Sequence, residues 1–488
     1  METQKPEEIP TEATATEPRS QYTLRGRMGT FGLLTTVLAF TAPLGIVFGF
    51  IPVNISFGIS VPIMFLGVAL LVALFAAGFT AMTKAIPRPG AFYTYICEGL
   101  GRPMGLGSSF LAIGTYGVNT ISCIVVAGIS ANNLISAFVG DATVPWWVWS
   151  LAFLVISSVL SYFNIELSAK ILSVILVIEV TIVAIFDFVM IANGGPEGNT
   201  FEPWNPANII TPSVGILLLF TIGVFNGFEA TAIYRDEVRN PSKTIPRATF
   251  LTVGFLGVFY AISGYALILS TGTSQAVATA KADPTGIMPA AITQYFGVFA
   301  NQLVSILIIT SFFASLLSLQ NIITRYAHSL SVDGIFPKRL ARVHEVHGSP
   351  YRSAMAVSLA LLVALIILIV SQGDPNALYA GAAGVAFYGI ILLLFLTGIA
   401  VIVYFRRNRT TTFSVWRTLV APIISILAIG TALLLATFNM EYLVAGDPLL
   451  LNALLLVSYI LLGSGVITAL VLRKKGSPLY RRIGRAVE

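Results

Sequence analysis

The chain has 488 residues, of which 56% are hydrophobic and only 10% are charged, and its mean hydropathy is +0.86. A soluble globular protein usually carries about 25% charged residues, so most of this surface cannot face water and a cytosolic enzyme is excluded. The net charge of +6 comes from Lys and Arg residues dispersed over loops, which argues against a nucleic-acid-binding protein. We expect an all-α protein that crosses the membrane many times.

Twelve membrane-spanning helices are predicted. Residues 29–83, 103–140 and 284–324 contain no charged residue, and each stretch exceeds the roughly 20 apolar residues that one membrane helix needs. The apolar runs are also longer than the strands of a membrane β-barrel. Hydrophobic windows place the spans at 30–54, 58–82, 104–133, 145–163, 169–191, 213–234, 247–271, 289–318, 352–371, 378–404, 418–438 and 449–472.

The basic residues predict the orientation. If the N-terminus is cytoplasmic, all of the 28 Lys and Arg residues except Lys281 fall on the inner side. Such a bias places both ends of the chain on the cytoplasmic side of the plasma membrane and supports an even number of spans. Residues 1–27 have no apolar core and are rich in Thr, Glu and Pro, so we expect a disordered cytoplasmic tail, and residues 473–488 form a basic one.

Two of the spans are interrupted. Span one contains Thr41, Ala42, Pro43, Leu44 and Gly45, where the proline removes a backbone donor and the glycine eases departure from helical geometry. Span six contains its own run of helix-breaking and polar residues, namely Gly223, Phe225, Asn226, Gly227, Phe228 and Glu229. Broken backbone at membrane depth is tolerated where it is buried in protein or lines a cavity. Both runs are therefore candidate substrate-binding segments.

The positions of the two breaks predict an inverted repeat. Each half begins with a broken span and contains five spans, and an odd number of spans per repeat turns the second copy over relative to the first. Residues 28–192 would form the first repeat, residues 193–404 the second, and residues 405–472 two further helices. Each break exposes backbone N–H groups that attract an anion and carbonyl groups that attract an ammonium. Such a site suits a zwitterion.

Three motifs of the chain resemble those of the amino acid-polyamine-organocation permeases. The first is residues 225–229 with residues 237–248. The second is residues 331–338 with residues 348–350, and the third, residues 86–95, is similar to the family's Pro-x-x-Gly-Gly-x-Tyr region. The resemblance covers residues 28–472 and implies a bacterial-type amino acid permease with the LeuT-type fold.

Two buried carboxyl groups are candidates for proton coupling, because ionisable groups inside a membrane are costly. The resemblance places Glu229 where some members carry a glutamate linked to the substrate site. It places Glu179 where certain proton-coupled members carry a lysine in place of sodium. The alternative for both residues is a structural carboxyl that bonds to neighbouring groups.

Further polar and aromatic side chains are weaker candidates. Tyr116 and Asn119 on span three could line the cavity or join packed helices. Phe225 and Phe228 could cover the substrate or belong to the core. The serines of span eight, Ser311, Ser315 and Ser318, share parts of one face.

The leading hypothesis is a secondary active transporter of an amino acid, coupled to protons and working by alternating access. A carrier of polyamines or small amines is the alternative within transport, and a nutrient sensor without net transport is the alternative of another class. No cofactor or metal site is expected, because the three histidines lack ligand spacing. Neither Cys97 nor Cys123 falls on the outer side, so no disulfide-linked heavy chain is expected.

Overall fold

The computed structural model describes residues 28–86, 92–139, 144–163, 169–344, 349–408, 413–443 and 448–484. Within these ranges the chain is helical, apart from loops and an isolated bridge between Met28 and Val238. The predicted tail of residues 1–27 lies outside the described residues.

The twelve predicted spans are confirmed. Ten helical segments of the described chain are long and apolar enough to cross a bilayer, and two shorter apolar helices stand where spans four and six are predicted. A helix of 25 residues such as α4 is about 38 Å long, which exceeds the hydrocarbon core of about 30 Å. The spans are α1, α2, η1 and α3 (Thr30–Thr41, Pro43–Gly45, Ile46–Phe50 and Ile51–Ile55), α4 (Val61–Ala85), α6 (Arg102–Val139), α7 (Trp146–Tyr162), α8 (Ala169–Asn193), α9 and α10 (Val214–Gly223 and Ala230–Ile233), α11 (Pro241–Thr271), α14 (Val298–Val332), α15 (Tyr351–Ser371), α16 (Pro375–Arg407), η6 with α17 (Trp416–Val420 and Ala421–Asn439) and α18 (Pro448–Lys474).

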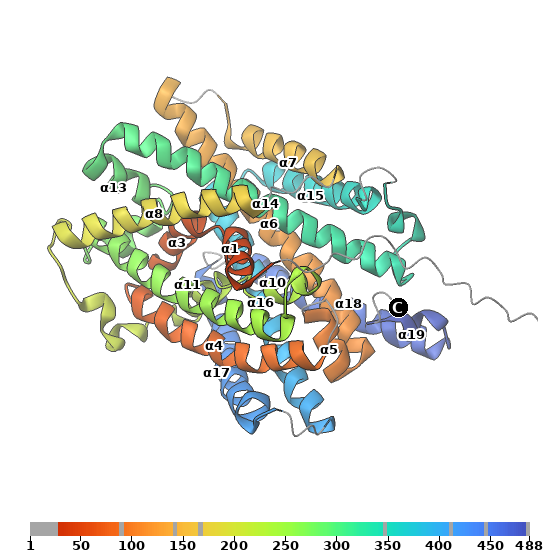
Figure 1. The fold of residues 1–488 in the computed structure, drawn as a ribbon. Coiled ribbons are helices and arrows are strands. Elements are labelled where there is room, and N and C mark those ends of the chain that lie inside the picture. The colour runs from red at the N-terminus through yellow and green to blue at the C-terminus, as the bar shows by residue number, and fades with distance from the viewer. Residues whose placement is uncertain are drawn as a thin grey trace, which may run out of the picture.

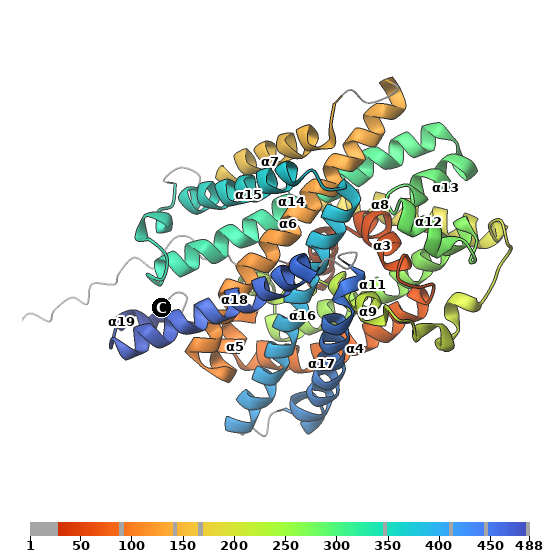
Figure 2. The ribbon, with the colours of Figure 1, turned by 180° about the vertical axis from the view of Figure 1, so that it is seen from behind.

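In the described part of the chain, four shorter α-helices lie outside the spans. They are α5 (Phe92–Leu100), α12 (Ala276–Ala282), α13 (Ile287–Phe296) and α19 (Pro478–Arg482). Figures 1 and 2 show α13 and α19 at opposite ends of the bundle. The predicted span 289–318 joins α13 to the first part of α14, whereas the structure separates them at Gly297, whose φ is +88°.

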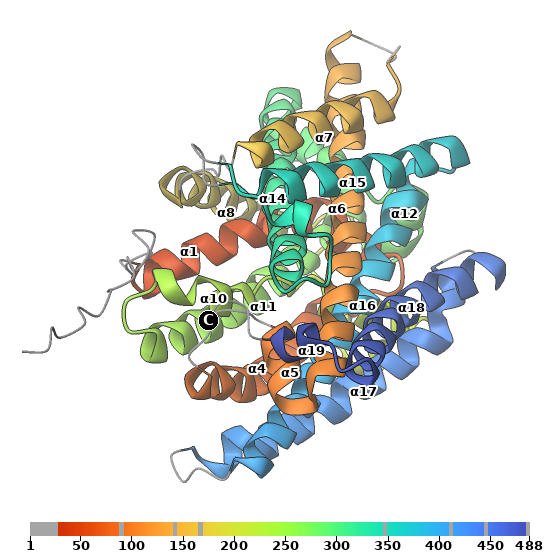
Figure 3. The ribbon, with the colours of Figure 1, turned by 90° about the vertical axis from the view of Figure 1, so that its right-hand side faces the viewer.

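The helix α6 runs through the middle of the bundle and packs along its length against α14, α16 and α18. Figure 3 shows α7 beside α15 on one flank, and these two helices are in contact. On the outward side of α15, Leu359, Ile367 and Val370 are exposed, and so are Leu427 and Leu434 on α17. Apolar side chains that point outward around the bundle are those expected of a surface that faces lipid rather than water.

The end of the described chain packs across α5, α6 and α14. The guanidinium group of Arg102 on α6 lies 5.5 Å from the centre of the Tyr480 ring on α19. The backbone N–H of Gly484 donates to the Tyr93 hydroxyl on α5 at 2.6 Å. Ile483 between them is buried. The C-terminal segment is therefore part of the fold at this end of the bundle.

We expect this docked segment to loosen as the pH rises. The Tyr93 hydroxyl also donates to Asp333 after α14, at 3.4 Å. Burial raises the pKa of Asp333 from about 4 to about 6, against the opposing effects of Tyr93 and Arg482. An acid whose pKa is raised in the docked state stabilises that state below its ordinary pKa, and the contribution is lost as the pH passes through about 6. Hydrogen exchange of residues 479–484, corrected for intrinsic rates, should be slower at pH 5 than at pH 7.5.

Asp333→Asn is the control for this prediction, because the amide keeps the shape of the side chain and does not titrate. Exchange in this variant should show the same protection at both pH values. Stronger protection of the wild type at pH 7.5 would contradict the prediction, since it would mean that attraction between ionised Asp333 and Arg482 outweighs burial.

Candidate functional site

Span one is interrupted at Ala42. This residue has a left-handed conformation, with φ 48° and ψ 66°, which costs a residue other than glycine about 1–2 kcal/mol. The new helix α2 begins at Pro43, whose missing N–H is not needed at the first helical position. Beyond Gly45 the span continues as the π-helix η1 before it returns to α-helical geometry in α3. The predicted break is confirmed.

Span six is interrupted between Gly223 and Ala230. Gly227 within this turn has φ +114°, a conformation that favours glycine. A Cβ atom at Gly223 would overlap the ring of Phe387 on α16, so glycine is also required where α9 ends. This second predicted break is confirmed as well.

The two broken spans are bonded directly to each other. The side-chain amide of Asn54 on α3 donates to the Thr221 hydroxyl on α9 at 2.7 Å, and both side chains are buried. The contact joins the second half of span one to the first half of span six.

A small pocket lies between the two breaks. Its cavity volume is about 30 Å³, which is room for about one water molecule, so the pocket is nearly closed. The Oδ1 atom of Asn226 is buried and has no hydrogen-bond partner in the described part of the chain. The central pocket is lined by Thr41, Ile46, Phe50, Asn119, Cys123, Gly223, Val224, Asn226, Ser315, Leu319 and Phe387.

Glu179 lies on α8 beside the break in span one. Its side chain is 3% exposed, and the Ser311 hydroxyl on α14 donates to its Oε2 atom at 3.1 Å. The backbone N–H of Leu44 lies within electrostatic range of this carboxyl group. Because Leu44 is in the first turn of α2, its N–H has no partner within the helix. Glu179 therefore lies beside one of the amides that the break exposes.

Glu229 has the corresponding place at the break in span six. Its side chain is 2% exposed. The Tyr116 hydroxyl on α6 donates to its Oε1 atom at 2.9 Å, and the backbone N–H of Gly227 donates to Oε2 at 2.8 Å. Tyr116, predicted as a substrate contact, thus bonds to Glu229 and is not among the residues that line the central pocket.

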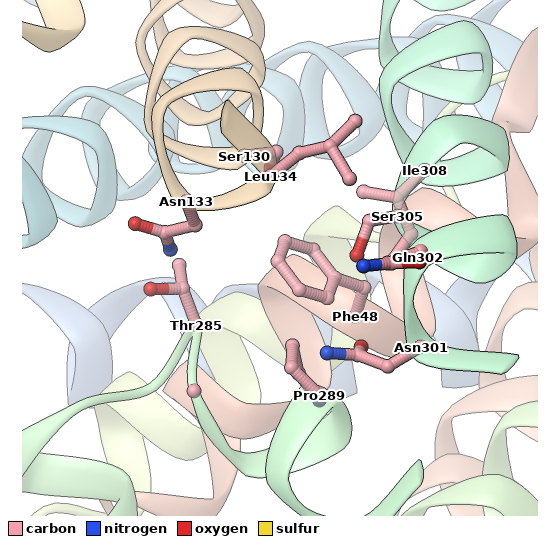
Figure 4. A pocket seen from close by; sticks show the side chains of 11 residues that line it. Phe48, Ser130, Asn133, Leu134, Thr285, Pro289, Asn301, Gln302, Ser305 and Ile308 are labelled. Atoms are coloured by element: carbon pink, nitrogen blue, oxygen red, sulfur yellow. The ribbon is translucent and has the colours of Figure 1, made fainter. Parts of the chain in front are cut away.

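A layer of aromatic rings separates the central pocket from a second, more polar one. The Phe312 ring on α14 lies edge-on to Phe48 at 6.3 Å and to Phe50 at 6.2 Å. Phe50 lines the central pocket and Phe48 lines the second. Figure 4 shows Phe48 in the middle of this second pocket, with Asn133 and Thr285 on one side and Asn301, Gln302 and Ser305 on the other.

The rings of Phe225 and Phe228 pack against α4. The Phe225 ring lies 6.3 Å from that of Phe65, and the Phe228 ring lies 5.9 Å from Phe75 and 6.1 Å from Phe79. Neither ring lines the central pocket, so the contacts seen here are those of core packing.

Several residues of the central pocket have no place among the leading sequence candidates. Cys123 follows Asn119 by four residues on α6, a spacing that puts both residues on one helix face. This spacing could have identified Cys123 as a residue that lines the pocket. Phe50 and Phe387 stand in uniformly apolar helices, where nothing local distinguishes them from core residues.

Comparisons with known proteins give one family. The model of the amino acid permease family matches residues 32–475. The putrescine transporter PotE of Haemophilus influenzae is 26% identical over 270 residues, which is 54% of this chain and 60% of that protein. The aromatic amino acid transport protein AroP of Escherichia coli K12 is 26% identical over 234 residues, or 46% of this chain and 50% of AroP.

A third relative is the branched-chain amino acid permease BcaP of Bacillus subtilis. It is 23% identical over 301 residues, which is 58% of this chain and 62% of that protein. The matches thus span between half and two thirds of the length of these relatives.

Proposed function

Because the chain belongs to the amino acid permease family, we propose that it is a secondary active transporter of a zwitterionic amino acid, coupled to protons. It works by alternating access in the cytoplasmic membrane, with both termini in the cytoplasm, as the distribution of Lys and Arg indicates. Residues 28–192 and 193–404 are the inverted repeats, and residues 405–472 are the two helices that follow them.

The observation that carries the proposal is that each broken span presents a backbone N–H to a buried glutamate. Glu179 lies beside the amide of Leu44, and Glu229 accepts a hydrogen bond from that of Gly227. An ionised glutamate and a substrate carboxylate both accept a hydrogen bond from the same backbone N–H. Their like charges repel at short distance, so the two groups compete for it. A proton on the glutamate weakens its hold and leaves the amide to the substrate. Proton and substrate then bind together, which is the requirement for symport.

The substrate ammonium group has an acceptor close to these amides. The unpartnered Oδ1 atom of Asn226 lies at the central pocket, and a buried acceptor without a donor is costly. An ammonium group supplies the missing donor. Thr41 at the break in span one lines the same pocket, so groups from both broken spans border the site.

The nearly closed pocket fits alternating access. A volume of about 30 Å³ cannot hold an amino acid, so the substrate enters when α1 to α3, α9 and α10 move away from α6, α7, α14 and α15. The spans that carry the breaks rock against the other helices, and the aromatic layer of Phe48, Phe50 and Phe312 separates the pocket from one side.

Transport of a small diamine is the second candidate function. The relative PotE is named as a putrescine transporter, and a glutamate that turned toward the pocket would pair with an ammonium group. A nutrient sensor would bind the same ligands without net transport.

Uptake into proteoliposomes tests the proposal. We expect radiolabelled phenylalanine or isoleucine to accumulate when the pH outside is lower than inside, with no dependence on sodium. A gradient of one pH unit supplies about 1.4 kcal/mol, which supports about tenfold accumulation with one proton per substrate. Accumulation of labelled putrescine, without accumulation of the amino acids, would favour the diamine carrier.

Two outcomes would contradict the proposal. Uptake that requires sodium and ignores the pH gradient would rule out proton coupling and leave Glu179 a structural role. Ligand binding without counterflow in the same vesicles would identify a sensor.

A further inference from the structure

A third buried carboxyl group lies inside the membrane on α8. Asp187 is 4% exposed, and its Oδ2 atom accepts a hydrogen bond from the Ser263 hydroxyl on α11 at 2.8 Å. Its Oδ1 atom is buried and has no hydrogen-bond partner among the described residues. Carboxyl groups at this depth are costly and occur mainly on proton or ion pathways.

Among the described residues, no cation acts on Asp187. Its helix packs against α1, α2 and α11. The helices α1 and α2 contain no charged residue, and the basic residues of α11, Lys243 and Arg247, stand in its first two turns, far from Ser263. A structural ion pair therefore does not account for this aspartate.

Asp187 and Glu179 lie on the same buried face of α8. They are eight residues apart, which is about 12 Å along the helix axis. Val183 stands midway between them on this face and is fully buried. Because a valine carries no proton, a direct path along α8 is blocked.

The neighbouring helix α11 offers hydroxyl groups beside this blocked stretch. Ser263 bonds to Asp187, and Tyr260 precedes it by three residues, so the two lie on one face of α11. The Tyr260 hydroxyl is buried beside Thr41 of the broken span one and lies within electrostatic range of Glu179. Ser263 thus bonds to one carboxyl group of α8, and Tyr260 lies within electrostatic range of the other.

We propose that Asp187 is the outer station of a proton path that runs through Ser263 and Tyr260 to Glu179. The inference rests on the proposed function, since it gives that proton a route. In the proposed orientation Asp187 is six residues, or about 9 Å, from the outer end of α8.

The transfer is balanced at each step. Asp187 takes a proton from outer water and passes it to the Ser263 oxygen, which releases its own proton toward Tyr260. The Tyr260 hydroxyl accepts this proton and donates its own to the Glu179 carboxylate, which becomes neutral. Asp187 is left as a carboxylate and is protonated again from outside.

The test separates proton-driven accumulation from exchange. Accumulation requires the proton to move in every cycle, whereas equilibrium exchange of labelled for unlabelled substrate does not require its release. In Asp187→Asn proteoliposomes we expect the initial rate of proton-driven accumulation of phenylalanine or isoleucine to fall by about a hundredfold, with the exchange rate unchanged. Asp187→Glu should restore accumulation, because it returns a carboxyl group.

Ser263→Ala and Ser270→Ala form a matched pair on α11. Ser263→Ala should slow accumulation and spare exchange, whereas Ser270, whose hydroxyl bonds to its own helix at Leu267, should be replaceable without effect. If Asp187→Asn does not reach the membrane, Ser263→Ala tests the same proton path while the Asp187 carboxyl group stays in place.

The outcomes are distinct. Unchanged accumulation in Asp187→Asn, or loss of exchange together with accumulation, would overturn the proton path and leave the proposed symport intact. A wild type that shows no proton-driven accumulation would instead overturn the proposed function itself.

Discussion

Replacing Gly227 by leucine should abolish transport while the protein still inserts into the membrane. The φ of +114° at this position is strained for any residue with a side chain, at a cost of about 1–3 kcal/mol. The Gly227 N–H holds Glu229, so a shift of the backbone also removes the amide from its carboxylate. Substrate uptake into proteoliposomes should fall to background, with the amount of reconstituted protein unchanged.

Gly254→Leu is the matched control. Gly254 lies on α11, is exposed on the outside of the bundle, and has open space where a Cβ would stand. Leucine there should leave uptake at the wild-type rate. Wild-type uptake in Gly227→Leu would instead remove the break in span six from the substrate site.

The second prediction concerns the charge of the substrate. If the amides at the breaks bind a carboxylate, the decarboxylated amine of a transported amino acid should compete poorly. Loss of a charge-assisted hydrogen bond costs on the order of 1.5–3 kcal/mol, which is roughly ten- to a hundredfold in affinity. Competition against labelled phenylalanine by unlabelled phenylalanine and by phenethylamine measures this ratio.

Glu229→Gln separates the two possible roles of this carboxyl. Glutamine keeps the shape of the side chain and an acceptor for the Gly227 N–H but removes the charge. We expect amines to remain the weaker competitors in this variant, because Glu229 bonds to Tyr116 and Gly227 rather than to the substrate. If amines compete as well as amino acids in the wild type and lose most in Glu229→Gln, the carboxyl pairs with the substrate cation directly.

The apolar runs and the helix-breaking residues made the spans and the two breaks predictable. Pro43 and Gly227 act locally, so their effect on the backbone can be inferred without knowledge of their neighbours. The boundary between α13 and α14 is different, because Gly297 lies in a long uncharged stretch where hydropathy changes little.

Contacts between distant parts of the chain account for what the sequence did not reveal. Phe387 faces Gly223 and Gly484 bonds to Tyr93 only because the bundle brings residues far apart in sequence together. Asp187 is a plainer omission, because it lies inside the predicted span 169–191 and its charge is visible in the sequence. Its relation to Ser263, however, depends on how α8 and α11 are rotated.

The hydrogen bond between Asn54 and Thr221 has a mechanical consequence. It joins one half of a broken span from each proposed repeat. We therefore expect these two half-helices to move as one unit instead of independently. Two half-helices that move as one unit can tilt toward either side of the membrane, but not toward both sides at once. Joint movement of the two broken spans is what alternating access requires, because one side of the site must close as the other opens.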